Sequence, residues 1–187
     1  EEVRKQGMMT ICTPFDEESI SVIMELDIEI IKIASCSATD KPLLKSIVEV
    51  NRPVIASTAG LSLDQFDRLV SFLKHNNVHF ALMHCVAIYP TPVEMLNLNH
   101  IEQVRQRYPD VTVGYSTHES PDNYSAIQIA YAKGARLFER HVGIENTMYK
   151  LNAYSSNPEQ VGRWLDAHQE AVKQWGGEER IPASPDE

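Results

Sequence analysis

The stretch Val111-Thr-Val-Gly-Tyr-Ser-Thr-His118-Glu119 decides how the rest of the chain is interpreted. It begins as a short apolar run that alternates in the manner of a buried β-strand. After Gly114 it ends in four side chains that can bind anions, metals or protons, namely Ser116, Thr117, His118 and Glu119. Polar chemistry at the carboxyl end of a strand is the arrangement expected in a parallel α/β barrel. This strand end is therefore the first candidate for a functional site.

A second apolar run ends in the same way. Residues 135–138 lead directly into Glu139, Arg140 and His141, which places a second histidine 23 residues after His118. That spacing is about one strand-plus-helix repeat, so neighbouring parallel strands would bring both imidazoles to the same end of the sheet. The two histidines predict a site that the rest of the chain must support.

Strand-like and helix-like runs alternate along the whole chain. The six expected strands are residues 8–12, 29–34, 53–57, 78–86, the run that starts at 111, and 137–141. The expected helices are residues 17–26, 42–50, 63–76, 99–108, 122–133 and 158–175. Strict alternation of this kind implies a parallel sheet whose helices connect neighbouring strands.

A barrel and an open doubly wound sheet both have this alternation. No Gly-x-Gly-x-x-Gly or Gly-x-x-x-x-Gly-Lys motif follows any expected strand, so the nucleotide-binding open sheets lose their best support. The polar groups that follow the strands are instead Thr13, Lys32 with Ser35, Ser57, Tyr89, Ser116 with His118, and His141. Barrels place their function at that rim. We therefore predict an α/β fold, a (β/α)8 TIM-type barrel that is incomplete because about six repeats stand where eight are needed.

The partial barrel is expected over residues 1–175. The chain begins without a methionine, in a stretch typical of a helix end, so we expect the two remaining strands upstream. Residues 176–187 open with two glycines and continue with two prolines and four acids, which is typical of a linker. We interpret the chain as a segment of a longer protein.

Composition excludes several classes of protein. The chain has 187 residues, 43% hydrophobic and 23% charged, which suits one globular core. A formal net charge of −9 and a pI near 5.2 argue against nucleic acid and anionic membranes as partners. No apolar run is long enough to cross a membrane. Cys12, Cys36 and Cys85 form no Cys-x-x-Cys pair, which predicts buried, reduced thiols in a cytoplasmic protein.

Lys32 lies inside an otherwise apolar strand. Since a strand of a parallel sheet is usually covered on both faces, this lysine is expected to be buried and to need an anionic partner. Ser35, Ser57 and Ser116 each follow a strand, where a single serine is ordinary turn chemistry. Together with the lysine, the three hydroxyls predict a cradle for a phosphate or a carboxylate.

His118 and His141 can be polar residues at strand ends or metal ligands. Two imidazoles at matching positions leave both interpretations open and make the metal site as good as the other, with Glu119 or Glu139 available to hydrogen-bond a histidine ligand. Sites made of histidine and water suit Mn²⁺, Zn²⁺ or Fe²⁺. Within a strand, His84 is expected in the core. The histidines expected at the surface are His75, His79, His100 and His168.

These residues belong to a series of motifs that resembles one known family. In chain order the motifs are Thr13-Pro-Phe-Asp16, Lys32-Ile-Ala-Ser35, Pro42-Leu-Leu44, Ser57-Thr58, His84-Cys-Val86, Tyr89-Pro-Thr-Pro92, Gly114-Tyr-Ser-x-His118 and Glu139-Arg-His141. The ordered set resembles the catalytic barrel of the sialic acid (N-acetylneuraminate) synthases, the NeuB family. The similarity covers residues 7–141 well and the remainder more loosely.

The resemblance implies a TIM-type barrel that condenses phosphoenolpyruvate with an N-acylated hexosamine or related aldose. The products would be a 2-keto-3-deoxy sugar acid and phosphate. The residues implied at the substrate site are Thr13, Lys32, Ser35, Ser57, Tyr89 and Ser116. The resemblance also implies a divalent metal, in most members Mn²⁺, bound by His118 and His141. It implies that Lys32, His118 and His141 are the catalytic residues. A homodimer and a C-terminal antifreeze-like domain beyond the linker are further implications.

Three positions depart from the family's pattern. Ser37 stands where an acidic residue usually contacts the sugar, and Ala87 stands where an asparagine usually helps to bind phosphoenolpyruvate. Asn152 lies near another acidic position of the family and is expected to contact substrate. These changes concern the sugar acceptor more than the donor. They predict either a different aldose as the acceptor or an inactive relative.

Two other functions stay open. A metal-dependent condensing barrel of the 3-deoxy-octulosonate-phosphate synthase type would need rim arginines for a phosphorylated sugar, and Arg140 is the obvious candidate. The three departures favour a non-catalytic barrel that binds a sugar acid or a partner protein, whereas the presence of Lys32, His118 and His141 together argues against it. The segment alone is expected to be inactive, because an unclosed barrel exposes sheet edges.

Overall fold

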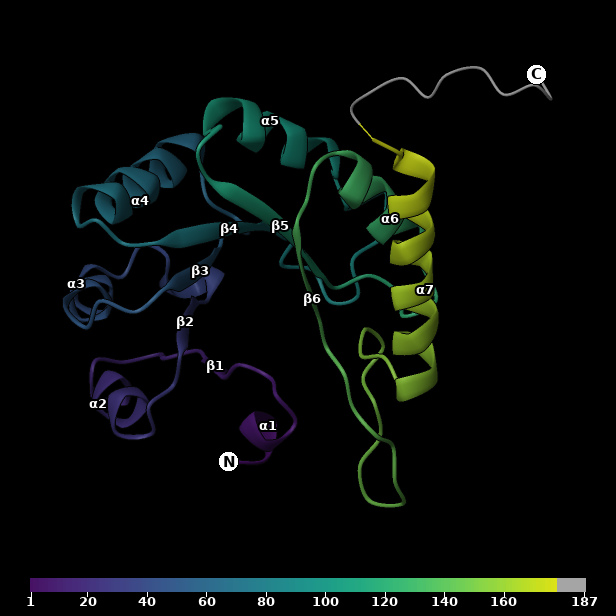
Figure 1. Ribbon diagram of the computed structural model, residues 1–187, viewed down its shortest axis with the longest axis horizontal. Coiled ribbons are helices and arrows are strands. Elements are labelled where there is room, and N and C mark those ends of the chain that lie inside the picture. The colour runs from purple at the N-terminus through teal and green to yellow at the C-terminus, as the bar shows by residue number, and fades with distance from the viewer. Residues whose placement is uncertain (178–187) are drawn as a thin grey trace.

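The computed structural model describes residues 1–177 and shows a parallel sheet with helices along its outer side (Figure 1). The strands are β1 (Ile11–Cys12), β2 (Ile30–Ile33), β3 (Val54–Ser57), β4 (Phe80–His84), β5 (Thr112–Thr117) and β6 (Leu137–Arg140). The helices are α1 (Glu2–Lys5), α2 (Glu18–Glu25), α3 (Lys41–Glu49), α4 (Leu63–His75), α5 (Asn99–Arg107), α6 (Ser125–Ala132) and α7 (Pro158–Trp175), and two 3₁₀ turns cover Ser35–Ser37 and Val93–Met95.

Each strand pairs in parallel with the next strand along the chain, so the order in the sheet is β1-β2-β3-β4-β5-β6. A doubly wound sheet reverses its order partway across, whereas the wall of a barrel runs in sequence. Figure 1 shows the sheet curling, with α2 to α7 arranged around its convex side. The predicted α/β barrel with six repeats is therefore confirmed, and the doubly wound alternative is wrong.

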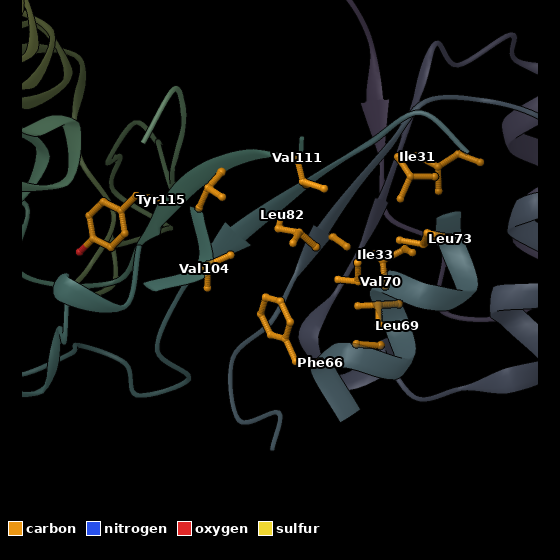
Figure 2. Packing of buried hydrophobic residues seen from close by; sticks show 14 of the residues in the cluster. Ile31, Ile33, Phe66, Leu69, Val70, Leu73, Leu82, Val104, Val111 and Tyr115 are labelled. Atoms are coloured by element: carbon orange, nitrogen blue, oxygen red, sulfur yellow. The ribbon is translucent and has the colours of Figure 1, made fainter. Parts of the chain in front are cut away.

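The hydrophobic core lies between the sheet and its helices. Ile31 and Ile33 of β2 are fully buried there, beside Val70 and Leu73 of α4 (Figure 2). Full burial of one such side chain is worth about 1.5–3 kcal/mol. Because side chains alternate along a strand, the residue between the two isoleucines, Lys32, is directed to the concave face. Burial of the two isoleucines on the outer face of the sheet therefore places the Lys32 side chain on its concave face.

Gly114 of β5 lies where neighbouring strands pack closely against its backbone. Met83 of β4 and Leu137 of β6 are its register partners on either side. A Cβ at this position would overlap Met83 Sδ and the backbone and side chain of Leu137. A glycine is required here because the neighbouring side chain and strand approach the β5 backbone so closely.

Capping residues begin and end several helices at the positions that the sequence predicts. Ser62 caps α4 and accepts the Gln65 amide, while the Gln65 side chain bonds back to the Ser62 amide, which completes a capping box. Gly134 follows α6 with a φ of +98°, in the left-handed region that favours glycine. The observed strands are shorter than expected at both ends of the run 78–86, where β4 covers Phe80–His84.

Burial of the cysteines differs from the expectation. Cys85 is buried as predicted, but Cys12 is half-buried and Cys36 is exposed in the 3₁₀ turn after β2, so the prediction of three buried thiols is wrong. Among the helices described, none is both long enough and apolar enough to span a bilayer. From residue 178 onward, the predicted linker lies outside the described residues.

Two of the histidines expected at the surface are half-buried instead. The His100 ring lies 5.3 Å from the ring of His84, which is buried in the core as predicted. The His168 ring lies 4.9 Å from Phe138, between α7 and the sheet. Both rings fill gaps between a helix and a strand, and this follows from helix packing that the sequence pattern does not show.

Candidate active site

The side chains of Ser116 and Glu139 meet at the carboxyl ends of the last two strands. The two residues are register partners of β5 and β6, so their side chains share the concave face. Ser116 Oγ donates a hydrogen bond of 2.6 Å to Glu139 Oε1. Ser116 is buried, and Glu139 is partly exposed at the mouth of the curled sheet.

Lys32 reaches the same carboxylate from β2. Its Nζ atom lies 3.0 Å from Glu139 Oε1 and 2.8 Å from Oε2. In a flat sheet, β2 and β6 would be separated by four strand spacings, about 19 Å, which two side chains cannot bridge at this distance. The ion pair therefore spans the concave side of a curled sheet. It also supplies the anionic partner that a buried lysine needs.

The charge of Glu139 is held by its neighbours. Burial disfavours the carboxylate, but the Lys32 charge and the hydrogen bonds from Lys32 and Ser116 outweigh this effect, so the pKa of Glu139 lies below its usual value. Sequence reasoning named Glu139 only as a possible support for a metal ligand. The signal that could have identified it is its position two residues before His141, on the same face of the strand.

His118 and His141 stand together beyond the ends of β5 and β6. Their ring centroids are 5.4 Å apart, with the planes tilted by 49°. His118 is buried and His141 is exposed. Burial lowers the pKa of both imidazoles, and at His141 the neighbouring His118 lowers it further. Both rings are therefore neutral near pH 7, the form that binds metal ions.

The chemistry of this pair fits a metal ion. His118 Nδ1 lies 2.9 Å from the Val86 carbonyl oxygen, so Nδ1–H donates there and Nε2 is left as a ligand. Metal–imidazole bonds are about 2.1 Å long, so rings at this separation can each direct a nitrogen at one ion. Within residues 1–177 no group of three or more His, Cys, Asp or Glu side chains is arranged to hold a metal. Water and substrate oxygens would complete the coordination.

Two tyrosines flank the imidazoles. The Tyr89 ring lies 4.5 Å from His118, and the Tyr154 ring lies 5.0 Å from His141 and 5.2 Å from Tyr89. Tyr89 was predicted from the sequence and is exposed at this mouth. Tyr154 was missed, because it comes from the loop between β6 and α7, where no periodic pattern marks it.

Other predicted substrate residues lie nearby or serve a local role. Ser35 Oγ accepts the Ala59 amide at 3.0 Å and contacts Cys85 Sγ at 3.4 Å. Ser57 is buried at the end of β3, and Thr13 is half-buried just after β1. No hydrogen bond of the described residues joins Thr13 or Ser57 to the Lys32–Glu139 pair.

Asn152 and the two other departures occupy different environments. The Asn152 side chain accepts the amides of Tyr154 at 3.1 Å and Ser155 at 2.7 Å, so it shapes the loop that carries Tyr154. Ser37 is buried in the 3₁₀ turn after β2, and Ala87 is exposed after β4.

Glu119 and Arg140 lie on the opposite face of the strands. Tyr115 OH donates to Glu119 Oε2 at 2.8 Å, and Arg140 Nη1 lies 3.7 Å from Glu119 Oε1. The Arg140 side chain is only 3% exposed. The sequence-based role of Arg140 as a rim ligand for a phosphosugar is therefore wrong, because strand alternation directs it away from the mouth.

The curled parallel sheet and the polar cluster at the carboxyl ends of its strands define a protein of the (β/α)8-barrel class. The sequence profile of the NeuB family matches residues 1–180. The chain belongs to the NeuB family.

Two curated relatives and one solved structure show the extent of the similarity. The chain is 36% identical over 133 residues to N-acetylneuraminate-9-phosphate synthase of Drosophila melanogaster, covering 71% of this chain and 35% of the relative. It is 32% identical over 165 residues to the spore coat polysaccharide biosynthesis protein SpsE of Bacillus subtilis, covering 87% and 44%. The chain thus spans less than half the length of these two relatives. The crystal structure of a putative spore coat polysaccharide biosynthesis protein E from Chromobacterium violaceum superposes with a TM-score of 0.95 at 49% identity, covering 99% of this chain and 55% of that one.

Proposed function

We propose that the intact protein is a sugar-acid synthase that condenses phosphoenolpyruvate with an N-acylated hexosamine or a related aldose. The products are a sialic-acid-like 2-keto-3-deoxy sugar acid and phosphate. Membership of the NeuB family and the name of the Drosophila relative support the class of reaction. The observation that carries the proposal is the meeting of Lys32, Ser116 and Glu139 beside the two histidines at one mouth.

Lys32 and Ser116 bind the anionic donor. An ammonium group has three N–H bonds, and Glu139 occupies at most two of them, so Lys32 keeps one donor for a phosphate or carboxylate oxygen. Ser116 donates its single proton to Glu139 in this structure, so it binds the anionic donor by turning that proton from Glu139 to a phosphate or carboxylate oxygen. Ser35, Ser57, Thr13 and Tyr89 line the neighbouring strand ends and contribute further hydroxyl groups.

His118 and His141 hold the divalent metal, which we propose to be Mn²⁺. When bound, this ion supplies a Lewis acid for the aldehyde of the open-chain sugar. The chain orients the ligands itself, because the Val86 carbonyl fixes the tautomer of His118. Tyr89 and Tyr154 flank the imidazoles. Glu139 remains charged and so holds the Lys32 ammonium at this mouth.

The test combines the intact protein with phosphoenolpyruvate, Mn²⁺ and a panel of aldoses, and measures phosphate release. Because the name of the Drosophila relative specifies a 9-phosphate product, the panel includes phosphorylated hexosamines. We expect release with at least one acceptor, and its loss on chelation of the metal and in Lys32→Met and His141→Ala variants. A folded protein that releases no phosphate with any acceptor would refute the proposal and favour a non-catalytic sugar-acid-binding barrel.

The assembly and location of the protein are part of the same proposal. We infer a homodimer of the intact protein in the cytoplasm, with phosphoenolpyruvate and the aldose as its small-molecule partners. Light scattering of the purified intact protein measures the mass directly, and a monomeric mass at working concentration would exclude the dimer.

A further inference from the structure

A buried ion pair lies directly behind the two histidines. Glu119 and Arg140 have side chains that are 0% and 3% exposed, and Glu119 Oε1 lies 3.7 Å from Arg140 Nη1. Among the described residues, neither of these two atoms has a hydrogen-bond partner. Buried polar atoms are nearly always satisfied, so an incompletely closed pair calls for an explanation.

The position of this pair follows from the end of the sheet. The last register pair of β5 and β6 is Thr117 with Arg140, so the ladder stops before both histidines. Adjacent residues of an extended chain point to opposite faces. His118 therefore stands opposite Glu119, and His141 stands opposite Arg140. Beyond the ladder, the ion pair connects the two strand ends on the outer face.

Arg140 also fixes the segments that surround the histidines. Its Nη2 donates to the Pro121 carbonyl at 2.8 Å, and its Nε donates to Ser156 Oγ. The Ser156 amide in turn donates to the His141 carbonyl at 2.9 Å. The guanidinium lies 5.3 Å from the Trp164 ring of α7. One side chain thus connects β6, the loop after β5 and the loop before α7.

We propose that Glu119 and Arg140 are positioning residues that hold the His118 and His141 imidazoles at the separation needed to bind one metal ion. This inference rests on the metal site of the proposed function. The hydrogen bonds of Arg140 to Pro121 and Ser156 stabilise the loops, but they do not require a charge on Glu119, and buried ion pairs as such can often be replaced by neutral side chains at little cost to stability. Groups that orient metal ligands, in contrast, typically change metal affinity by about 10- to 100-fold when removed.

The test measures Mn²⁺ affinity of the intact protein by calorimetry, together with thermal unfolding of the metal-free form. A Glu119→Gln/Arg140→Met double variant removes both charges and leaves no unpaired buried ion. We expect it to fold with a lowered unfolding temperature, because the Pro121 carbonyl and the Ser156 hydroxyl lose their donor, and to bind Mn²⁺ about tenfold more weakly. Arg140→Lys keeps the charge but loses the planar fork, and we expect it to weaken Mn²⁺ binding as well.

The matched control is Glu159→Gln/Arg163→Met, which removes an ion pair on the exposed side of α7 with an N–O distance of 2.6 Å. We expect its Mn²⁺ affinity to equal that of the wild type. A Glu119/Arg140 double variant that binds Mn²⁺ within twofold of the wild type overturns the inference while the metal site stands. If that variant does not fold, Arg140→Lys serves as the test, and Mn²⁺ binding within twofold of the wild type again overturns the inference. A wild-type protein that binds no Mn²⁺ overturns both the metal site and this inference.

Discussion

Replacing Lys32 by methionine tests whether β2 and β6 meet across the concave face. Breaking a fully buried ion pair by removing one partner costs roughly 3–5 kcal/mol, whereas an exposed pair contributes roughly 0–1 kcal/mol. The Lys32 side chain is 10% exposed and that of Glu139 is 40% exposed, so this pair falls between the two limits. We expect the free energy of unfolding to fall by about 2 kcal/mol, because a half-buried carboxylate loses its counter-charge.

Urea unfolding of the wild type and the Lys32→Met variant measures this change. The chain offers a control with the same geometry, since Lys74 Nζ lies 2.8 Å from Asp110 Oδ2, the separation found between Lys32 and Glu139 Oε2. The Lys74 and Asp110 side chains are 41% and 66% exposed, so neither partner is as buried as Lys32 and Lys74→Met is expected to change stability less. The Lys32→Met/Glu139→Gln double variant removes both charges and should recover most of the loss. A Lys32→Met protein as stable as the wild type would refute the curled arrangement of the sheet.

Two further predictions concern packing and pH. Gly114→Ala is expected to lower the free energy of unfolding by about 1–3 kcal/mol, because its Cβ would overlap neighbours on both sides. Gly162→Ala in α7, where nothing lies within 4 Å of the added Cβ, should raise the free energy of unfolding by about 0.5–1 kcal/mol. Thermal unfolding of both variants measures these changes, and equal effects would contradict the packing at Gly114. The hydrogen bond from Arg107 lowers the pKa of Asp67 from 3.8 to about 2, so the stability from this group is present above pH 3.8 and is lost as the pH falls toward 2. Acid unfolding of Asp67→Asn should therefore be less steep than that of the wild type in this window, and identical slopes would show that Asp67 is not paired.

Much of the fold could be predicted from the sequence because it depends on local periodicity. The apolar run from residue 111, the helix that Gly134 ends and the cap at Ser62 all follow from interactions within a few residues. Alternation of strands and helices then leaves few topologies, and the absence of a phosphate-binding glycine motif weakened the case for a doubly wound sheet, which the strand order then excluded. The predicted first and last residues of the strands were less accurate, because the point at which a strand stops pairing depends on the adjacent strand.

Residues of the candidate site were predicted unevenly for a physical reason. Lys32, Ser116 and His118 lie on regular strands or directly after them, where position indicates the rim. The direction of Arg140 was misjudged, because one residue of register moves a side chain to the other face. Tyr154 had no signal in the sequence, since its place depends on the path of the loop between β6 and α7.

By itself, the sequence determined the order and type of the elements, the parallel sheet and the set of polar residues that follow the strands. Only the tertiary structure decided which of them meet. Lys32 finds its counter-charge in Glu139, 107 residues away, because the sheet curls, and Glu119 and Arg140 turn away from the histidines because side chains alternate across it. The hydrophobic periodicity of the sequence reflects contacts within a few residues, whereas the curvature of the sheet depends on how all six strands and their helices pack together.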